Sequence, residues 1–442
     1  MKRIAIAVAA LLTTVGAWAE GYQINTLSAK QLGMGHTGTA LKLGSESMIF
    51  NPGALGFSDK TIDLSCSVTG IKAIATAEHN GQEYKTENGL STPLAVSASF
   101  KIYNNLQAGV AFYTPYGSAI NWTNDWPGAI LNQKVDLKTY TIQPTISWRI
   151  TPKLSVGVGM MLTWGSVNLD KALLSGQQFD ALAGMLGLPM TLGHAPAASV
   201  NLTGTSQVAV GANIGAMYDI TDKWTVGANF RTKMGMKVTA GIAKVSYASD
   251  KVQGVLDQIL GDKNLGLINE SNFKASMPCP YVLNFGVSYK PLSNLVIAAE
   301  AQLTGWKTYE QLDILFPDYL SGFNQNIPKH YKNAWAYHLG AQYGLTERFD
   351  IRAGLMVDTT PVNSNFYNPE TPGMTKIEPT VGFSFRPIRN LSIDLAFMYI
   401  AGLGEDNAKC TYKNSLTGAE DTFEANYKVH AFAPSVGLSY SF

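Results

Sequence analysis

The chain has 442 residues, of which 46% are hydrophobic and 15% are charged, and its 33 basic and 32 acidic side chains leave a formal net charge of +1. This charge content is low for a soluble domain of such length, and the lack of a basic excess argues against a nucleic-acid partner. The three cysteines, Cys66, Cys279 and Cys410, have no metal-binding spacing and an odd number cannot pair fully. With no His-x-x-x-His pair either, we predict no metal site and no cofactor.

The first 19 residues have the pattern of a secretory signal peptide. Lys2 and Arg3 precede an apolar run over residues 4–15, and Ala17-Trp18-Ala19 supplies a small-residue cleavage site. The mature protein is therefore expected to start near Glu20. Beyond this segment no run of 18 apolar residues occurs, so no transmembrane helix is expected.

Residues 20–60 are rich in Gly, Ser and Thr and show no sustained alternation. Gly33-Met34-Gly35-His36-Thr37-Gly38 matches a dinucleotide-binding pattern but lacks the preceding strand, the following helix and the downstream acidic residue. We interpret these glycines as sites of tight turns. Asn51-Pro52-Gly53 is interpreted as a rigid turn. The segment is predicted to fold into the lumen of a barrel as a hatch.

Residues 61–442 alternate between bulky apolar and small or polar side chains. At the C-terminus, Phe432, Val436 and Phe442 share one face of a strand, whereas the opposite face carries small residues such as Gly437. This pattern is typical of a membrane-spanning β-barrel. Six short polar turns each join two such strands, and one strand precedes and one follows them, which predicts 14 strands.

Short turns on one side and long loops on the other predict an all-β, antiparallel barrel in the outer membrane of a Gram-negative-type bacterium. Tryptophans near strand ends suit the girdles at the two membrane interfaces; they are Trp148, Trp164, Trp224, Trp306 and Trp335. Pro115-Tyr116-Gly117 interrupts the third strand. Because Pro cannot donate to a sheet and Gly weakens a strand, this break predicts a gap in the barrel wall.

Two long loops, residues 170–189 and 252–268, have apolar residues at near-helical spacing and are predicted to contain short helices outside the membrane. Their apolar stripes must be buried. The helices either pack only on each other or also form a groove for an apolar ligand. The candidate groove residues are Leu173, Leu174, Phe179, Leu182, Leu186, Val255, Leu256, Ile259 and Leu260.

Three lysines are candidate partners for a ligand carboxylate. Lys171 opens the first of the two apolar loops, and Lys329 and Lys332 lie at the start of the tenth strand. Any one such lysine is more often solvated surface than a ligand partner. No G-x-S-x-G elbow and no S-x-x-K motif with its partners occurs, so no enzymatic activity is expected.

Several motifs in order resemble the FadL family, the outer-membrane transporters of long-chain fatty acids and related hydrophobic compounds. They are Gly21-Tyr22-Gln23-Ile24-Asn25, Leu32-Gly33-Met34-Gly35, Asn51-Pro52, Tyr116-Gly117, Trp306-Lys307-Thr308-Tyr309-Glu310-Gln311-Leu312, Arg352-Ala353-Gly354 and Asp358-Thr359-Thr360-Pro361-Val362. The family usually has Asn-Pro-Ala in its hatch, whereas here Gly53 precedes Ala54.

The resemblance implies a monomeric 14-stranded barrel with an N-terminal hatch. It further implies passive diffusion from a groove between the third and fourth extracellular loops to an inner pocket, then lateral exit into outer-membrane lipids at the kinked third strand. Lys171 falls where the family has a cation facing the ligand's carboxylate, and Lys329 falls near a second one.

Transport of long-chain fatty acids is the leading hypothesis. A channel for aromatic or other hydrocarbons is the first alternative. A general porin would have an unplugged N-terminus, and an adhesive or structural barrel would have polar loops; these are the remaining alternatives.

Overall fold

The computed structural model describes residues 21–188, 190–260, 270–413 and 419–442, and the predicted signal peptide, residues 1–19, lies outside them. The helices are short: α2 (Ala29–Leu32), α3 (Ser47–Phe50), α4 (Pro52–Leu55), α5 (Gly176–Met185) and α6 (Asp250–Leu260), with 3-10 turns η1 (Gly44–Glu46), η2 (Pro127–Ile130), η5 (Trp306–Thr308), η6 (Asp318–Phe323) and η7 (Ser364–Phe366). Among the described residues, no helix combines the length and apolar character that crossing a membrane requires.

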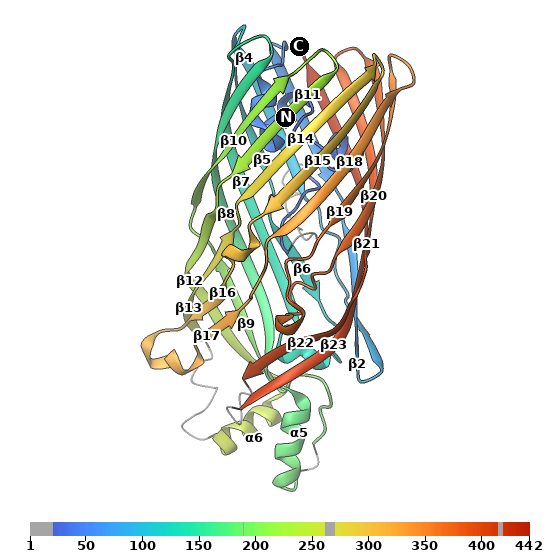
Figure 1. Cartoon of the computed structure of the whole chain (residues 1–442). Helices are drawn as coiled ribbons and strands as arrows, with labels where there is room; N and C mark the ends of the chain where they lie inside the picture. The colour runs from blue at the N-terminus through green and yellow to red at the C-terminus, as the bar shows by residue number, and fades with distance from the viewer. Residues whose placement is uncertain (1–20, 189, 261–269, 414–418) are drawn as a thin grey trace.

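The strands form one antiparallel sheet closed into a barrel (Figure 1). We number its barrel strands 1–14, each built from one or two consecutive segments. Barrel strands 1–7 are β1 (Ile62–Thr69) with β2 (Lys72–His79), β3 (Gln82–Lys85) with β4 (Leu94–Tyr103), β5 (Leu106–Tyr113) with β6 (Gly117–Asn121), β7 (Lys134–Arg149), β8 (Leu154–Leu174), β9 (Ala198–Thr205) with β10 (Ala209–Asp219), and β11 (Trp224–Arg231) with β12 (Met234–Tyr247).

Barrel strands 8–14 are β13 (Glu270–Cys279) with β14 (Val282–Leu292), β15 (Leu295–Thr304) with β16 (Gln311–Leu315), β17 (Gln325–Pro328) with β18 (Ala334–Gly344), β19 (Phe349–Asp358), β20 (Lys376–Ile388), β21 (Leu391–Gly402) with β22 (Glu405–Lys413), and β23 (Glu420–Ser441). The last strand pairs with the first, for example Leu64 with Tyr440, and so closes the barrel. The predicted count of 14 strands is confirmed.

The two faces of the wall differ as the alternation predicts. On β23, Phe432, Val436 and Leu438 are 43%, 41% and 50% exposed on the outside, whereas Ala431 and Ala433 are fully buried in the lumen. In a bilayer the outward apolar side chains contact lipid, and closure pairs the backbone groups of the first strand with those of the last.

Outward-facing aromatic residues form two belts. One belt lies next to the short turns and includes Trp148, Trp224, Tyr289, Tyr343 and Tyr440; eight residues farther along four of the same strands stand Tyr140, Tyr281, Trp335 and Phe432. Eight residues span about 26 Å of extended strand, which at a strand tilt of about 40° is a height of roughly 20 Å, of the order of the roughly 25 Å of a membrane-embedded apolar band. The turn side of the barrel is therefore the membrane-embedded part. The prediction that Trp306 lies in a girdle is wrong, because this residue is fully buried inside the barrel.

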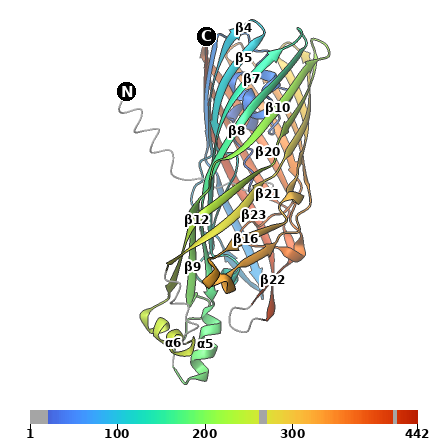
Figure 2. The same cartoon turned by 90° about the vertical axis from the view of Figure 1, so that its left-hand side faces the viewer.

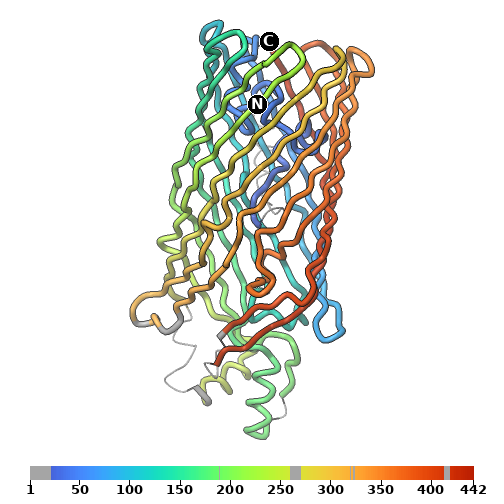
Figure 3. Tube along the Cα trace, in the orientation of Figure 1, coloured from blue at the N-terminus to red at the C-terminus, as the bar shows by residue number. Residues whose placement is uncertain are grey.

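Residues 21–60, here called the N-terminal segment, lie inside the barrel near the end that carries the short turns (Figure 3). Glu300 on β15 accepts hydrogen bonds from the backbone N–H groups of Gly38 and Thr39, both at 2.9 Å. The side chain of Gln143 on β7 donates to Met48 O at 2.7 Å. The wall thus satisfies backbone groups that the segment's short helices leave open.

The glycine-rich motif of this segment makes close backbone contact with the wall. Gly35 has φ +63°, and a Cβ there would lie 2.5 Å from Leu339 O and 2.7 Å from Leu355 N. Its N–H donates to Thr380 Oγ1 at 3.0 Å. The motif therefore serves a tight turn pressed against barrel strands 10 and 11.

The predicted loop helices are present as α5 and α6, at the end of the barrel opposite the C-terminus (Figure 2). The first loop begins later than the predicted residue 170, because residues up to Leu174 continue strand β8. Its helix begins at Gly176. The capping box of Ser175 and Gln178 fixes that start. Residue 189 and residues 261–268 of the predicted loops lie outside the described part of the chain.

Candidate functional site

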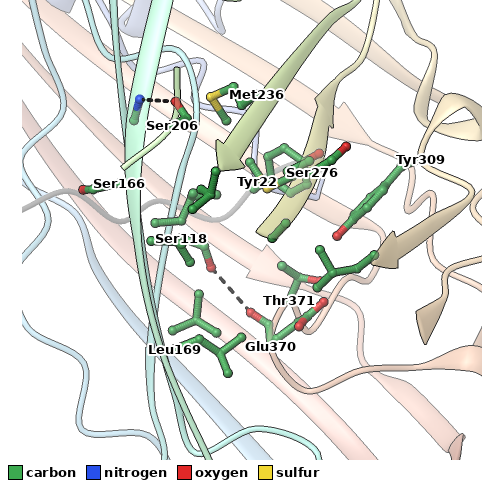
Figure 4. A pocket seen from close by; sticks show the side chains of 18 residues that line it. Tyr22, Ser118, Ser166, Leu169, Ser206, Met236, Ser276, Tyr309, Glu370 and Thr371 are labelled. Atoms are coloured by element: carbon green, nitrogen blue, oxygen red, sulfur yellow. Dashed lines mark hydrogen bonds between the residues drawn. The ribbon is translucent and has the colours of Figure 1, made fainter. Parts of the chain in front are cut away.

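A cavity lies in the lumen, on the loop side of the N-terminal segment. Most of its lining surface is apolar, and its polar side chains are seven that carry hydroxyls and one carboxylate (Figure 4). Such a cavity suits an apolar ligand with at most one polar end. The lining residues are Tyr22, Ser118, Val135, Leu137, Gly165, Ser166, Val167, Leu169, Ser206, Met236, Val238, Ala275, Ser276, Met277, Tyr309, Leu312, Glu370 and Thr371.

Tyr22 of the N-terminal segment forms one wall of this cavity. Its ring packs edge-on against Trp306 at a centroid distance of 4.7 Å and against Tyr309 at 5.7 Å. Its hydroxyl donates a hydrogen bond to Pro278 O. A side chain from the start of the N-terminal segment is thus held between barrel strands 8 and 9, a contact that the sequence pattern does not reveal.

The interruption predicted at Pro115-Tyr116-Gly117 separates β5 from β6. Here the N-terminal segment adds a short antiparallel pairing: Ile24 N donates to Pro115 O at 2.8 Å and Gly117 N donates to Tyr22 O at 2.9 Å. On the other side, the hydroxyl of Thr139 binds both the N–H and the C=O of Tyr116. The kinked backbone is therefore satisfied from inside the barrel.

The ladder between barrel strands 2 and 3 is interrupted at this kink. The pairing of β4 with β5 ends with Ala95↔Tyr113, and Thr114 N donates to Leu94 O at 3.2 Å. Within the described residues, pairing resumes only at the bridge Thr86↔Trp122. Because Tyr116 is bonded to Thr139, the residue before Tyr140, the interruption lies at the level of the aromatic belt farther from the turns.

The Asn51-Pro52-Gly53 turn docks on the wall. Asn51 caps α4 through its Oδ1, and its Nδ2 donates to Thr39 O at 2.6 Å and to Ala216 O at 3.0 Å. A Cβ at Gly53 would lie 2.9 Å from Ala216 Cα, so the position next to β10 has no room for a side chain. The glycine that departs from the family's usual alanine therefore matches the local packing.

The three candidate lysines lie in different environments. Lys329 is 1% exposed, forms an ion pair with Glu370 and lies 5.5 Å from the centroid of the Tyr309 ring. Lys171 donates to Gln325 Oε1 at 3.1 Å and interacts electrostatically with both Lys329 and Glu370. Lys332 has an exposed side chain. The structure thus brings Lys171 and Lys329 near one carboxylate, and the ligand-binding role of all three stays a prediction.

The candidate groove residues are largely used in helix packing. Leu174 and Phe179 form a buried cluster with Val252 and Leu256, and Leu173 and Val255 pack against it. Leu182 is partly buried and Leu186 is 53% exposed, while the side chains of Ile259 and Leu260 lie outside the described part of the structure. None of the candidate groove residues lines the cavity described above. The arrangement agrees with the alternative in which the helices pack on each other.

Residues 359–375, here called loop 359–375, join β19 to β20 and fold into the lumen. Residues 367–374 are buried. The indole N–H of Trp122 donates to Pro369 O at 3.3 Å, and the ring of Tyr367 stacks on Tyr427 at 4.5 Å. No sequence pattern points to the inward fold of this loop or to Glu370, although the family-like motif Asp358-Thr359-Thr360-Pro361-Val362 opens it.

Within the described residues, no group of three or more His, Cys, Asp or Glu side chains is placed to hold a metal ion. Cys66, Cys279 and Cys410 are free thiols. The chemistry available at the cavity is therefore that of apolar contact, hydroxyl hydrogen bonds and the Lys329–Glu370 ion pair.

Comparisons with known proteins agree with this geometry. Residues 10–442 match the family model described as outer membrane protein transport protein (OMPP1/FadL/TodX). A long-chain fatty acid transport protein of Escherichia coli O6:H1 is 21% identical over 463 residues, covering 99% of this chain and 98% of that protein. Outer membrane protein P1 of Haemophilus influenzae is also 21% identical, over 475 residues, with coverages of 99% and 98%.

Solved structures share the fold. A Pseudomonas aeruginosa FadL homologue has a TM-score of 0.79 at 18% identity, covering 96% of this chain and 100% of that one. The Pseudomonas putida toluene transporter TodX has a TM-score of 0.70 at 18% identity, with coverages of 96% and 99%. At this identity the likeness concerns the fold alone.

Proposed function

Because the chain belongs to the outer membrane transport protein family that groups OMPP1, FadL and TodX, an outer-membrane family of transporters for hydrophobic compounds, we propose that it carries long-chain fatty acids by passive diffusion. The ligand enters from the loop side, occupies the cavity, and leaves sideways into the membrane at the kinked third strand. Residues 20–60 act as the hatch between cavity and opening.

One observation carries the proposal: Tyr22 lines the cavity while its backbone pairs with Gly117 at the kink. The same short stretch of the N-terminal segment thus separates the apolar cavity from the interrupted ladder. A small displacement of residues 22–24 would join the two. Because the interruption lies at the outer aromatic belt, the ligand would enter the membrane close to its outer interface.

The physical requirement for such cargo is a dry route. Burying a tail of about sixteen carbons gains roughly 0.8 kcal/mol per methylene, on the order of 10 kcal/mol in all. A water-filled pore would forfeit that energy. A lateral path keeps the tail in contact with apolar groups throughout, and movement of the hatch supplies the weakening of the site that release requires. One barrel contains the entire route, so the proposal needs a monomer only.

Uptake of aromatic hydrocarbons is a second candidate. It is favoured by the apolar cavity lining and by the ion pair that already occupies Lys329. The toluene transporter TodX shares the fold. A general porin agrees less well with a lumen that contains the N-terminal segment.

The test is uptake in a Gram-negative host that lacks its own transporters of this family. Cells producing the full chain should take up radiolabelled oleate at least tenfold faster than cells with an empty vector, with no gain for a neutral disaccharide. Faster uptake of toluene but not oleate would favour the second candidate. A gain for the disaccharide alone would contradict both.

A further inference from the structure

The buried ion pair at the cavity points to a residue that sets the charge of the cargo. We infer that Glu370 is a built-in competitor for the ligand's carboxylate: it occupies Lys329 when no acid is bound and is displaced when a fatty acid arrives. This inference rests on the proposed function and assigns ligand selection to a residue outside the sequence motifs.

Glu370 lies between the cavity and Lys329. Its carboxylate lines the cavity and pairs with Lys329, whose side chain is almost fully buried. A cation in such a place needs a counter-charge. A carboxylate on a ligand in this cavity would have the same chemistry as the carboxylate that Glu370 now provides.

The charges of Lys171, Lys329 and Glu370 do not cancel. Lys171 and Lys329 interact electrostatically with each other and with Glu370. Within the described residues, no acidic side chain lies within 4.0 Å of the Lys171 ammonium group, whose hydrogen-bond partner is the neutral Gln325. Two cations and one carboxylate leave one positive charge, which suits a monoanion rather than a neutral cargo. Lys171 can hold the incoming carboxylate while Glu370 still occupies Lys329.

Glu370 also connects loop 359–375 to the kinked strand. Its backbone carbonyl accepts a hydrogen bond from Ser118 Oγ of β6 at 3.4 Å (Figure 4). Its neighbours Pro369 and Thr371 bond to Trp122 and Tyr331. The backbone of Glu370 and Pro369 therefore ties loop 359–375 to the kinked strand, while the side chain of Glu370 holds Lys329. Carboxylate exchange at Lys329 is in this way linked to the segment next to the lateral opening.

The internal carboxylate also explains how release remains possible. A buried lysine without a counter-charge would bind a fatty acid strongly and retain it. With Glu370 present, each ligand carboxylate that leaves Lys329 is replaced, so that no uncompensated charge is left behind. The competitor lowers affinity for acids and favours turnover.

The experiment compares dodecanoate with dodecanol, at pH 8, by equilibrium dialysis of the detergent-purified full chain. In Glu370→Gln the affinity for dodecanoate should rise at least tenfold while that for dodecanol changes less than twofold, and uptake of the acid by cells should become slower. In Lys329→Gln the further change Glu370→Gln should have no effect, because the competition acts through Lys329.

Equal changes for acid and alcohol in Glu370→Gln, or no rise for the acid, would overturn the inference. If Glu370→Gln yields too little folded barrel, as judged by heat-modifiable mobility in gels, Glu370→Asp replaces it; its shorter reach should weaken the pair and raise acid affinity in the same direction, and an unchanged affinity would then reject the inference. Failure of the wild-type chain to bind either compound would instead contradict the proposed function.

Discussion

The two ends of the lumen are filled in different ways. At the turn end, the N-terminal segment is joined to the wall by backbone contacts and by many polar bonds, among them those of Glu300 to Gly38 and Thr39 and a Lys30–Asp394 contact of 3.8 Å. At the loop end, loop 359–375 is held by stacked aromatic rings, by hydrogen bonds such as those of Pro369 and Thr371, and by the Lys329–Glu370 ion pair.

We propose that the loop end is the part of the lumen that rearranges during transport. Close glycine contacts such as that of Gly35 leave no slack, whereas an ion pair and stacked rings can exchange partners without creating voids. In the proposed mechanism the turn end acts as a floor that blocks straight passage through the barrel. Cargo that enters from the loop end then leaves through the wall, where residues 22–24 cover the kink.

Removing the N-terminal segment should have the largest effect, which we expect on the conductance of the barrel. Deletion of residues 21–58 is expected to leave a folded barrel, because the wall is closed by its own backbone pairing. Single-channel conductance in planar bilayers should rise severalfold above that of the intact chain. Deletion of α5, ten residues outside the lumen, is the control and should leave conductance unchanged; equal conductance of the hatch deletion and the intact chain would contradict the sealing role.

Straightening the kink in barrel strand 3 should have the second-largest effect, which we expect on oleate uptake. Pro115→Thr combined with Gly117→Val restores a backbone donor and a β-forming side chain, so strand 3 can pair with strand 2. Oleate uptake should fall at least tenfold with unchanged heat-modifiable mobility. Pro434→Thr, on the lipid-facing side of β23, serves as the matched control. Unchanged uptake in the straightened variant would rule out lateral exit at this point.

Removing the Lys171 cation should weaken dodecanoate binding about five- to tenfold. Lys171→Met removes the positive charge that balances a ligand carboxylate, so dodecanoate should bind more weakly while dodecanol should not. Each factor of ten corresponds to about 1.4 kcal/mol. Lys332→Met, at an exposed position, is the control, and equal loss for acid and alcohol would exclude a carboxylate role for Lys171.

The smallest effect is expected from Gly53→Ala, which introduces the family's usual residue. The added Cβ would lie 2.9 Å from Ala216 Cα, and overpacking of this kind costs about 1–3 kcal/mol. Hydrogen exchange of residues 21–60 should become faster while the barrel strands keep their protection. Ala54→Gly tests the neighbouring position; protection of the N-terminal segment equal to wild type in Gly53→Ala would show that the wall can yield there.

Part of the candidate site could be anticipated and part could not. The kink at Pro115 and Gly117 follows from the chemistry of those two residues, and Lys171 and Lys329 were proposed from their positions in the family pattern. Glu370 gave no signal, because its partner is 41 positions away and its loop has no periodicity. Tyr22 likewise meets Pro278, 256 positions away.

The sequence by itself determined the wall of this protein: alternation with period two and six short turns specify 14 strands, with bulky residues outside and small ones inside, because both signals are local. The sequence also predicted that the N-terminal segment enters the lumen, but only the tertiary structure decided which side chains meet there. There Trp306 faces Tyr22 rather than lipid, and Glu370 occupies Lys329, while outside the lumen α5 packs on α6. These contacts join side chains from distant strands, and their choice depends on shape and charge balance that no local pattern encodes.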